Sequence, residues 1–395
     1  MHRVHVGEWF VLGEDAFRKL RLNSPASGWF PALQELYWCI AEHNLPYVDL
    51  SFSPHLTGIS ILVSRSWRNS HVPHSLLPVI ASIISAFPGS ALQSLCVDVG
   101  HCMVPWQYFQ DSLSSVILRC GPPLVEFVSP IPLSEAAVDH LVQLPRLHTW
   151  RIEGPPPNYS ASSFPLVFPP LTELTLEEDI ARGWLSLFKR LEDNASTTMG
   201  VTPLSNVKES LKVLNIGSLP NPIIIDISFT SIRLFQNLVH LNVETDCHDD
   251  DEGQCTFKLN DGNVTELATA LPRLESLLLG HACFANSCAT TVACLLPISV
   301  HCVELQKLEV HFNTTNIVDN LKDVSEDTRF QELRSLPRCS LLRLDVYRMP
   351  LTLDDPGFET VASGMIIIFP SLWACDGLDD AWGELSERIA KIQEM

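Results

Sequence analysis

A six-residue phrase of apolar and polar positions returns along the whole chain. It reads Leu-x-x-Φ-x-Φ, where Φ is an apolar residue, so that its first, fourth and sixth positions are apolar. This alternation is typical of a short β-strand with one buried face. Full copies begin at Leu33, Leu56, Leu92, Leu147, Leu171, Leu211, Leu238, Leu274, Leu305 and Leu341, and degenerate copies begin at Leu124 and Leu372.

Proline just upstream makes the phrase more specific. Pro-x-Leu opens seven copies, five of them full, which is more than 28 prolines would give by chance. Proline cannot continue a helix, so it predicts that a helix ends and that the chain turns into the next strand. These prolines are Pro31, Pro54, Pro122, Pro145, Pro169, Pro272 and Pro370.

Segments before several phrases have helical spacing instead. The apolar positions predict helices at residues 76–87, 134–144, 262–271 and 358–369. Residues 379–395 form a charged amphipathic segment, which we expect to be a C-terminal capping helix.

The interval between phrases predicts the architecture. Successive phrases begin 23 to 40 residues apart, and leucine-rich repeats run about 20–29 residues. We therefore expect an α/β solenoid. It would be an irregular leucine-rich-repeat horseshoe of about twelve ragged repeats over residues 33–378, with parallel strands on the concave face and helices on the convex face. Residues 1–32 would be an N-terminal cap or the remnant of an upstream segment. The expected core includes Leu36, Leu174, Leu214, Leu241, Leu277, Leu308 and Leu344. An ordinary α/β domain with leucine-rich strands is the alternative.

The charge balance excludes some classes of partner. The chain has 26 Lys and Arg against 46 Asp and Glu, a formal net charge of −20. Nucleic acids and anionic membranes require concentrated basic residues, so we expect neither as a partner. The N-terminus has no apolar run of signal-peptide length, and no uncharged stretch is long enough to span a bilayer. The expected location is therefore cytoplasmic or nuclear, with the 12 cysteines reduced.

No sequence motif argues for an enzyme. The chain has no phosphate-binding loop of the Gly-x-x-x-x-Gly-Lys type and no Gly-x-Gly-x-x-Gly. It also lacks a Gly-x-Ser-x-Gly nucleophile elbow and a His-Glu-x-x-His zinc motif. We expect a non-catalytic protein without a cofactor.

Two regions contain residues that could bind a metal. The first contains His281, Cys283, Cys288, Cys294, His301 and Cys302. Zinc sites place paired ligands two to four residues apart, whereas these cysteines are five and six residues apart, so we expect core thiols. In the second, residues 246–255, the sixth position counted from Asp249 is Gln254 and not the glycine of a calcium loop, so we expect a solvated acidic insertion.

The third, fifth and seventh phrase positions would face the concave side, where carboxylates outnumber cations by about three to one. They suggest a groove for a basic or hydrogen-bonding segment of a target protein, with Tyr37 and Tyr347 as anchors. The alternative is the ordinary exposed strand face of an acidic protein. The candidate protein-binding residues are Tyr37, Arg151, Glu153, Glu173, Glu177, His240, Asn242, Glu244, Glu309, His311, Asp345 and Tyr347; Glu35 and Glu126 occupy the same face.

The phrases FPALQELYW, LPRLHTWRI, FPPLTELTL and LPRLESLLL resemble those of the F-box/leucine-rich-repeat proteins of mushroom-forming fungi. The resemblance covers residues 17 to 378. It implies that the repeats recruit a target protein to a cullin-type ubiquitin ligase, whose adaptor binds an N-terminal F-box.

The chain departs from that family at its start. Too few residues precede Leu33 for an F-box. Either the box has been lost or it lies upstream of this sequence. The resemblance therefore favours a substrate-recognition subunit of a ubiquitin ligase, with a free-standing leucine-rich-repeat scaffold as the alternative; the adaptor would be a partner only if an F-box exists.

Overall fold

The computed structural model describes residues 3–6, 18–19, 22–23, 30–40, 53–63, 77–87, 89–98, 107–152, 168–176, 183–189, 204–217, 231–244, 259–280, 289–326, 339–341, 343–347, 351–377 and 380–394. The chain divides into two compact units. Unit 1 comprises Met1–Leu174 and Asn194–Val207, and unit 2 comprises Thr175–Asp193 and Lys208–Met395.

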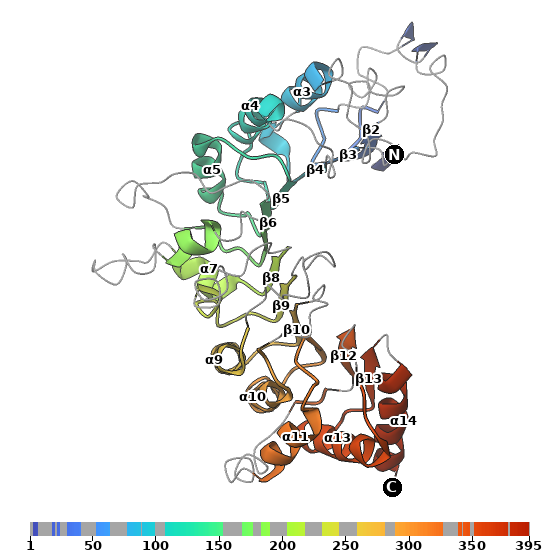
Figure 1. Ribbon diagram of the computed structural model, residues 1–395. Coiled ribbons are helices and arrows are strands. Elements are labelled where there is room, and N and C mark those ends of the chain that lie inside the picture. The colour runs from blue at the N-terminus through green and yellow to red at the C-terminus, as the bar shows by residue number, and fades with distance from the viewer. Residues whose placement is uncertain are drawn as a thin grey trace, which may run out of the picture. The chain divides into compact units, whose positions relative to one another are not determined.

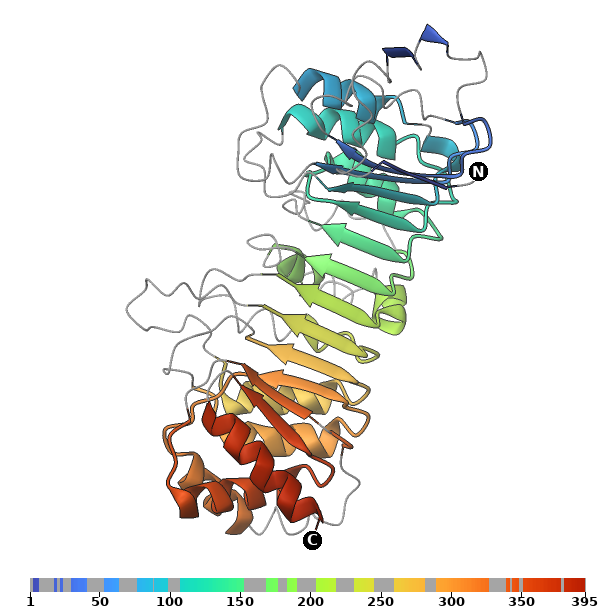
Figure 2. The same ribbon diagram turned by 90° about the vertical axis from the view of Figure 1, so that its right-hand side faces the viewer.

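Short parallel strands follow one another in chain order in each unit (Figures 1 and 2). Unit 1 contains β1 (Arg3–Val6), β2 (Glu35–Ile40), β3 (Gly58–Val63), β4 (Ser94–Asp98), β5 (Glu126–Ser129) and β6 (Thr149–Ile152). The division falls within β7 (Glu173–Leu176). Unit 2 contains β8 (Val213–Ile216), β9 (His240–Val243), β10 (Ser276–Leu279), β11 (Lys307–Val310), β12 (Arg343–Tyr347) and β13 (Ala374–Gly377). The fold is therefore α/β with an all-parallel sheet.

The fourth position of each phrase forms a buried row across neighbouring strands. In unit 1 the row runs Leu36, Ile59, Leu95, Phe127, Trp150. In unit 2 it runs Leu214, Leu241, Leu277, Leu308, Leu344, Cys375. All seven predicted core leucines are at most 1% exposed, so this prediction is confirmed.

The proline before a phrase occupies a tight turn. The N–H of Leu33 donates to the carbonyl of Phe30 (3.0 Å), with Pro31 as the second residue of that turn. The N–H of Leu274 donates in the same way to the carbonyl of Leu271 (3.4 Å). Proline favours this second position because its ring fixes φ near the value that the turn requires.

Helices precede many of the strands, as the apolar spacing predicts. The four predicted internal helices are found as α3 (Leu77–Ser85), α5 (Glu135–Val142), α9 (Asp261–Ala270) and α13 (Asp355–Ile368). The structure adds α4 (Gln107–Ile117), α7 (Ser205–Ser210), α10 (Leu295–His301), α11 (Ile317–Glu326), a helix at 183–189 and the short 3-10 helices η2 (Gly89–Ala91) and η4 (Val292–Cys294). Within the described ranges, no helix is both long and apolar enough to cross a bilayer.

In each unit, helices that connect successive strands lie on one side of the strands, whereas α14 (Asp380–Glu394) follows the last strand and packs against it. Figure 1 shows α3, α4 and α5 on one side of the strands of unit 1, and α9 and α10 on one side of those of unit 2. Figure 2 turns the strands toward the viewer, with these helices behind them. The opposite side of the strands, which we call the strand face, carries the third and fifth phrase positions.

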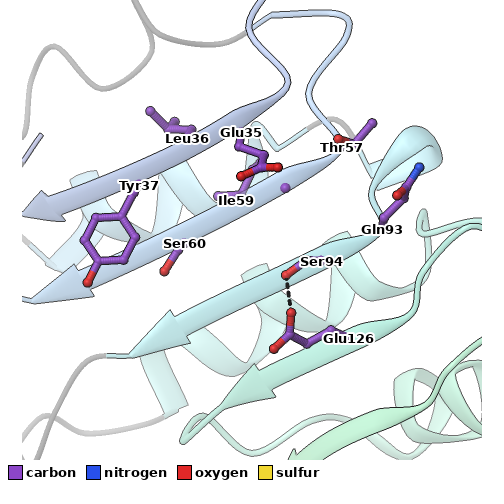
Figure 3. Close-up of a pocket in the computed structure, with 10 residues that line it drawn as sticks. Glu35, Leu36, Tyr37, Thr57, Ile59, Ser60, Gln93, Ser94 and Glu126 are labelled. Atoms are coloured by element: carbon purple, nitrogen blue, oxygen red, sulfur yellow. Dashed lines mark hydrogen bonds between the residues drawn. The ribbon is translucent and has the colours of Figure 1, made fainter. Parts of the chain in front are cut away.

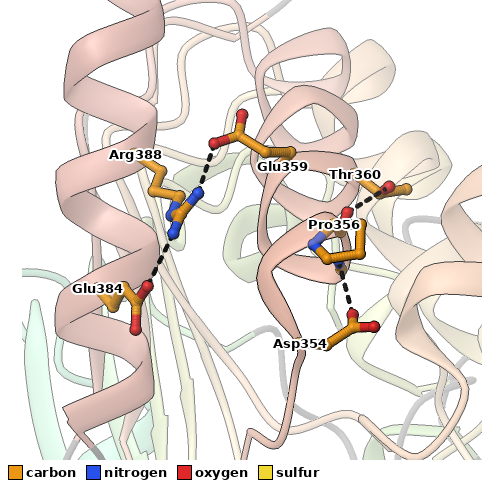
Figure 4. A network of polar contacts seen from close by, with 7 residues as sticks. Asp354, Pro356, Glu359, Thr360, Glu384 and Arg388 are labelled. Atoms are coloured by element: carbon orange, nitrogen blue, oxygen red, sulfur yellow. Dashed lines mark hydrogen bonds and ion pairs between the residues drawn. The ribbon is translucent and has the colours of Figure 1, made fainter.

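The predicted C-terminal helix is α14 (Asp380–Glu394), and it packs against α13 and β13. The guanidinium of Arg388 bridges Glu359 on α13 (2.6 Å) and Glu384 on α14 (3.0 Å), as Figure 4 shows. It also lies over the ring of Phe358, 5.6 Å from the ring centre. At the start of α13, the carboxylate of Asp354 accepts from the N–H of Gly357 (2.8 Å).

Helix α14 also supplies hydrogen bonds to β13, the last strand. The hydroxyl of Ser386 accepts from the N–H of Cys375 (2.9 Å) and lies 2.6 Å from the carbonyl oxygen of the same residue. Both backbone groups lie in a strand that has no following strand in the sheet order. Ser386 thus satisfies backbone groups that would otherwise be available for pairing with another chain.

We expect Ser386→Ala to destabilise unit 2. The substitution leaves the N–H and the carbonyl of Cys375 without the hydroxyl, and an unsatisfied buried backbone group costs about 1–3 kcal/mol. The free energy of unfolding in urea would fall by that amount. Ser363→Ala, at an exposed position of α13, is the control and should leave stability unchanged. Equal stability of the two variants would contradict the role assigned to Ser386.

One strand was not predicted. Residues 3–6 form β1, which pairs with β2 in register from Arg3 opposite Glu35 to Val6 opposite Trp38. The segment RVHV alternates polar and apolar residues as a strand does, but it lacks the leucine phrase on which the other strand predictions rested.

Candidate binding surface on the strands

The strand face consists of half-buried, mostly polar side chains that alternate with the core. In β4, β5, β7, β8 and β10, residues of intermediate exposure alternate with buried ones. Since parallel strands in register place equivalent positions side by side, each position forms a row across the strands. The two units are considered separately.

In unit 1, two rows carry the predicted residues Tyr37, Arg151 and Glu173. Tyr37 on β2 and Arg151 on β6 belong to one row, and Ser60, Cys96 and Val128 stand between them. Glu173 on β7 lies beside β6, where its N–H donates to the carbonyl of His148 (3.0 Å). All three predicted side chains are partly exposed, as predicted for the strand face.

A pocket of about 310 Å³ opens on the strand face of unit 1 (Figure 3). Its wall on one side comes from Glu35 and Tyr37 of β2, and on the other from Glu126 of β5. The hydroxyl of Ser94 donates to Glu126 Oε2 (2.7 Å) and holds that carboxylate over β4. The full lining is Glu35, Leu36, Tyr37, Thr57, Gly58, Ile59, Ser60, Gln93, Ser94 and Glu126.

Small residues create this pocket, and none of them is among the predicted binding residues. The outward positions of β3 and β4 that line the pocket are occupied by Gly58, Ser60 and Ser94. A Cβ atom on Gly58 would lie 3.3 Å from Glu35 Cγ, so glycine allows the Glu35 side chain to lie over β3. The sequence signal was present as LTGISI and LQSLCV, two consecutive phrases with small residues at outward positions.

In unit 2, the structure brings together the predicted residues His240, Asn242 and Glu244 around β9. His240 is exposed, and the amide of Asn242 donates to Glu244 Oε1 (3.0 Å). On the neighbouring strand the amide of Asn215 donates to Thr175 Oγ1 (3.3 Å). Among the described residues, the buried Oδ1 atom of Asn242 has no hydrogen-bond partner.

Farther along unit 2, the predicted residue Asp345 is half-buried on β12. Its strand also carries Arg343, which forms an ion pair with Asp376 on β13. This cation is therefore already matched by a carboxylate of the same face. For a partner protein, β12 and β13 therefore present the Arg343–Asp376 ion pair and the carboxylate of Asp345.

The prediction was wrong for Glu309 and His311, which are not part of an exposed surface. Glu309 is 5% and His311 8% exposed, and both side chains have interactions within the chain. Alternation predicts exposure only where one face of a strand stays open. Just beyond β11 another segment pairs with the chain, since the N–H of Asn313 donates to the carbonyl of Thr290 (2.8 Å).

The remaining predicted residues lie outside the described residues. These are Glu153 and Glu177, the side chain of Tyr347 on β12, the acidic segment 246–255, and residues His281, Cys283 and Cys288 of the cysteine–histidine region. Of the rest of that region, His301 is exposed, whereas Cys294 and Cys302 are buried. The Cys302 thiol lies 3.7 Å from the carbonyl oxygen of Leu271, to which it donates. Within the described part of the chain, no group of three or more His, Cys, Asp or Glu side chains is placed to hold a metal.

The described cysteines are free thiols, mostly in the core. Burial raises the pKa of Cys120 and of Cys302 to about 12, and it raises the pKa of Cys375 as well. Near the pocket, burial raises the pKa of Cys96, and Asp98 and Glu126 act in the same direction. These thiols are therefore protonated and unreactive at neutral pH.

We expect this burial to make the protein less stable in alkaline solution. Between pH 9 and pH 12 the unfolded thiols ionise while Cys120 and Cys302 stay protonated, so the unfolded state binds fewer protons and stability falls as pH rises. The loss should be about 1 kcal/mol for each thiol by pH 10. Urea unfolding at pH 7.5 and pH 10 measures it. In Cys120→Ala and Cys302→Ala the loss should be smaller; an undiminished loss in both variants would contradict the explanation.

Neither a protein-family model nor a curated protein sequence matches this chain.

Proposed function

We propose that the chain is an irregular leucine-rich-repeat solenoid that binds another protein along its strand face. In this proposal the strands line the concave side and the helices the convex side. The function is recognition without catalysis. The target would present neutral or basic groups, because the chain has a net charge of −20.

One observation carries the proposal: in each unit, rows of partly exposed polar side chains cross the strands on the side opposite the helices. An all-parallel sheet is ordinarily covered on both faces, and its strands are then apolar on both faces. A polar, half-buried strand face is what a surface for hydrogen bonds with a partner requires. The phrase interval of 23 to 40 residues supports the repeat architecture.

The resemblance to F-box/leucine-rich-repeat proteins supports a more specific context. There the chain would select the substrate of a cullin-type ubiquitin ligase. The alternative is a scaffold with the same binding face but no connection to a ligase. Both place the target on the strand face and differ only in whether the ligase adaptor joins the complex.

Co-purification tests the proposal. The full chain carrying an affinity tag would be expressed in its native cells, crosslinked and purified, and its partners identified by mass spectrometry. We expect a protein partner in stoichiometric amount, and the ligase adaptor with it if the ligase context holds. A partner without the adaptor would favour the free scaffold. A chain recovered without any stoichiometric protein would contradict the proposed function.

A further inference from the structure

The charged residues that line the pocket on unit 1 all have the same sign. Its ten lining residues include two carboxylates, Glu35 and Glu126, and no Lys, Arg or His. The carboxylates come from strands β2 and β5, with the small side chains of β3 and β4 between them. A ligand group seated in the pocket would therefore have an acceptor on either side (Figure 3).

The Glu126 carboxylate is held in place before any ligand arrives, and Glu35 has room to lie over β3. The Ser94 hydroxyl binds Glu126 Oε2, and the second oxygen of a carboxylate remains able to accept from another donor. Glu35 extends over β3 because Gly58 has no side chain. Positioned acceptors of this kind strengthen charge-assisted hydrogen bonds, since little ordering is needed on binding.

The remaining lining fits a long side chain with a flat cationic end. Tyr37 provides an aromatic ring beside the acceptors, and the short side chains of Ser60 and Ser94 leave room for the stem of a ligand side chain. A volume of about 310 Å³ is at the lower end of the roughly 300–1,000 Å³ of small-molecule pockets. It suits one side chain better than a cofactor.

We propose that this pocket binds an arginine side chain of an extended segment of the partner protein, with the guanidinium between Glu126 and Glu35 and the stem along Tyr37. Arginine fits better than lysine because its planar, five-donor group reaches two separate acceptors and stacks on aromatic rings. The inference rests on the proposed function, because it assigns one contact of the same strand face.

A peptide library tests this contact without knowledge of the partner. A phage-displayed library of linear 12-residue peptides would be selected on the full chain. The best peptide would then be synthesised with its arginine, with citrulline and with lysine in its place. Each peptide would be titrated against the wild-type chain, Glu126→Gln, Glu35→Gln and the control Glu304→Gln. Glutamine keeps an acceptor for Ser94 but removes the charge, and Glu304 is exposed outside the pocket.

The expected result is a conserved arginine in the selected peptides. Affinity should fall at least about tenfold with citrulline and with Glu126→Gln, less with lysine, and remain unchanged with Glu304→Gln. Because citrulline and Glu126→Gln remove the same contact, their effects should not add when combined. Thermal unfolding of each variant at the wild-type temperature shows that the fold is retained.

Two results would overturn the inference. The first is that selected peptides bind without arginine, or bind both Glu126→Gln and Glu35→Gln as tightly as they bind the wild-type chain. The pocket would then not be the contact, while the proposed function would stand. A library that yields no binding peptide would also reject it, because a pocket for one extended segment should be found by such a selection. The proposed function would then be decided by co-purification of the partner.

Discussion

Leu277→Asp should unfold unit 2 or lower its melting temperature by at least about 10 °C. Leu277 is fully buried and lies in register between Leu241 and Leu308, at the middle of the apolar row. A carboxylate at this position has no charged partner in the row, and burying an unpaired charge costs several kcal/mol. Circular dichroism during heating measures the effect.

The neighbouring position provides a matched control. Ser276 precedes Leu277 in β10 and points to the strand face, where it is half-buried. Ser276→Asp introduces the same charge in the same strand and should change the melting temperature by only a few degrees. If the two variants melted at the same temperature, the buried row could not be the core that the register indicates.

Charge reversal on the strand face should give the largest effect on binding. Glu173 in unit 1 and Glu244 in unit 2 are partly exposed on the strand face, so lysine can replace either without entering the core. We expect Glu173→Lys and Glu244→Lys each to weaken capture of the partner by about tenfold or more, because a repelling charge replaces an attracting one. Quantitative co-purification from crosslinked cells measures the capture.

The controls reverse charges elsewhere on the same units. Asp111 is exposed on α4 in unit 1, and Glu304 is exposed before β11 in unit 2. Glu266 and Glu359 would be poor controls, since they form ion pairs with Arg233 and Arg388. If Asp111→Lys and Glu304→Lys abolished capture while the strand-face reversals did not, the partner would bind on another side of the molecule.

Much of the fold could be predicted because the phrase encodes it locally. Leu214 and Leu241 are buried and paired as expected, since a short parallel strand in register must stack equivalent positions. The prolines indicated turns correctly, because their fixed φ suits one turn position wherever it occurs. Even the degenerate phrase at Leu372 forms a strand, although Cys375 replaces the usual leucine.

Features that depend on distant segments could not be predicted. Glu309 and His311 follow the alternation of the strand face and yet are buried, because burial depends on what other segments cover. The hydroxyl of Ser386 serves β13 only because α14 packs there. A serine in an amphipathic helix carries no sign of that role.

The candidate surface was predicted in part. Tyr37, Arg151 and Glu173 were correctly placed on the strand face of unit 1 because outward positions follow from the period of two. The pocket beside them was not predicted, because it forms where Gly58 has no side chain and Ser60 has a small one. A cavity can be recognised from sequence only when the registers of adjacent strands are already known.

Site-specific photocrosslinking measures most directly whether the strand face is the binding surface. A photoreactive residue would replace Thr149 or Ser276 on the strand face, or Ala136 on α5 or Thr269 on α9, all exposed or half-buried positions. Crosslinked adducts with the co-purified partner should form from Thr149, Ser276 or both, and not from either helix position. Adducts from Ala136 or Thr269 alone would contradict binding by the strand face.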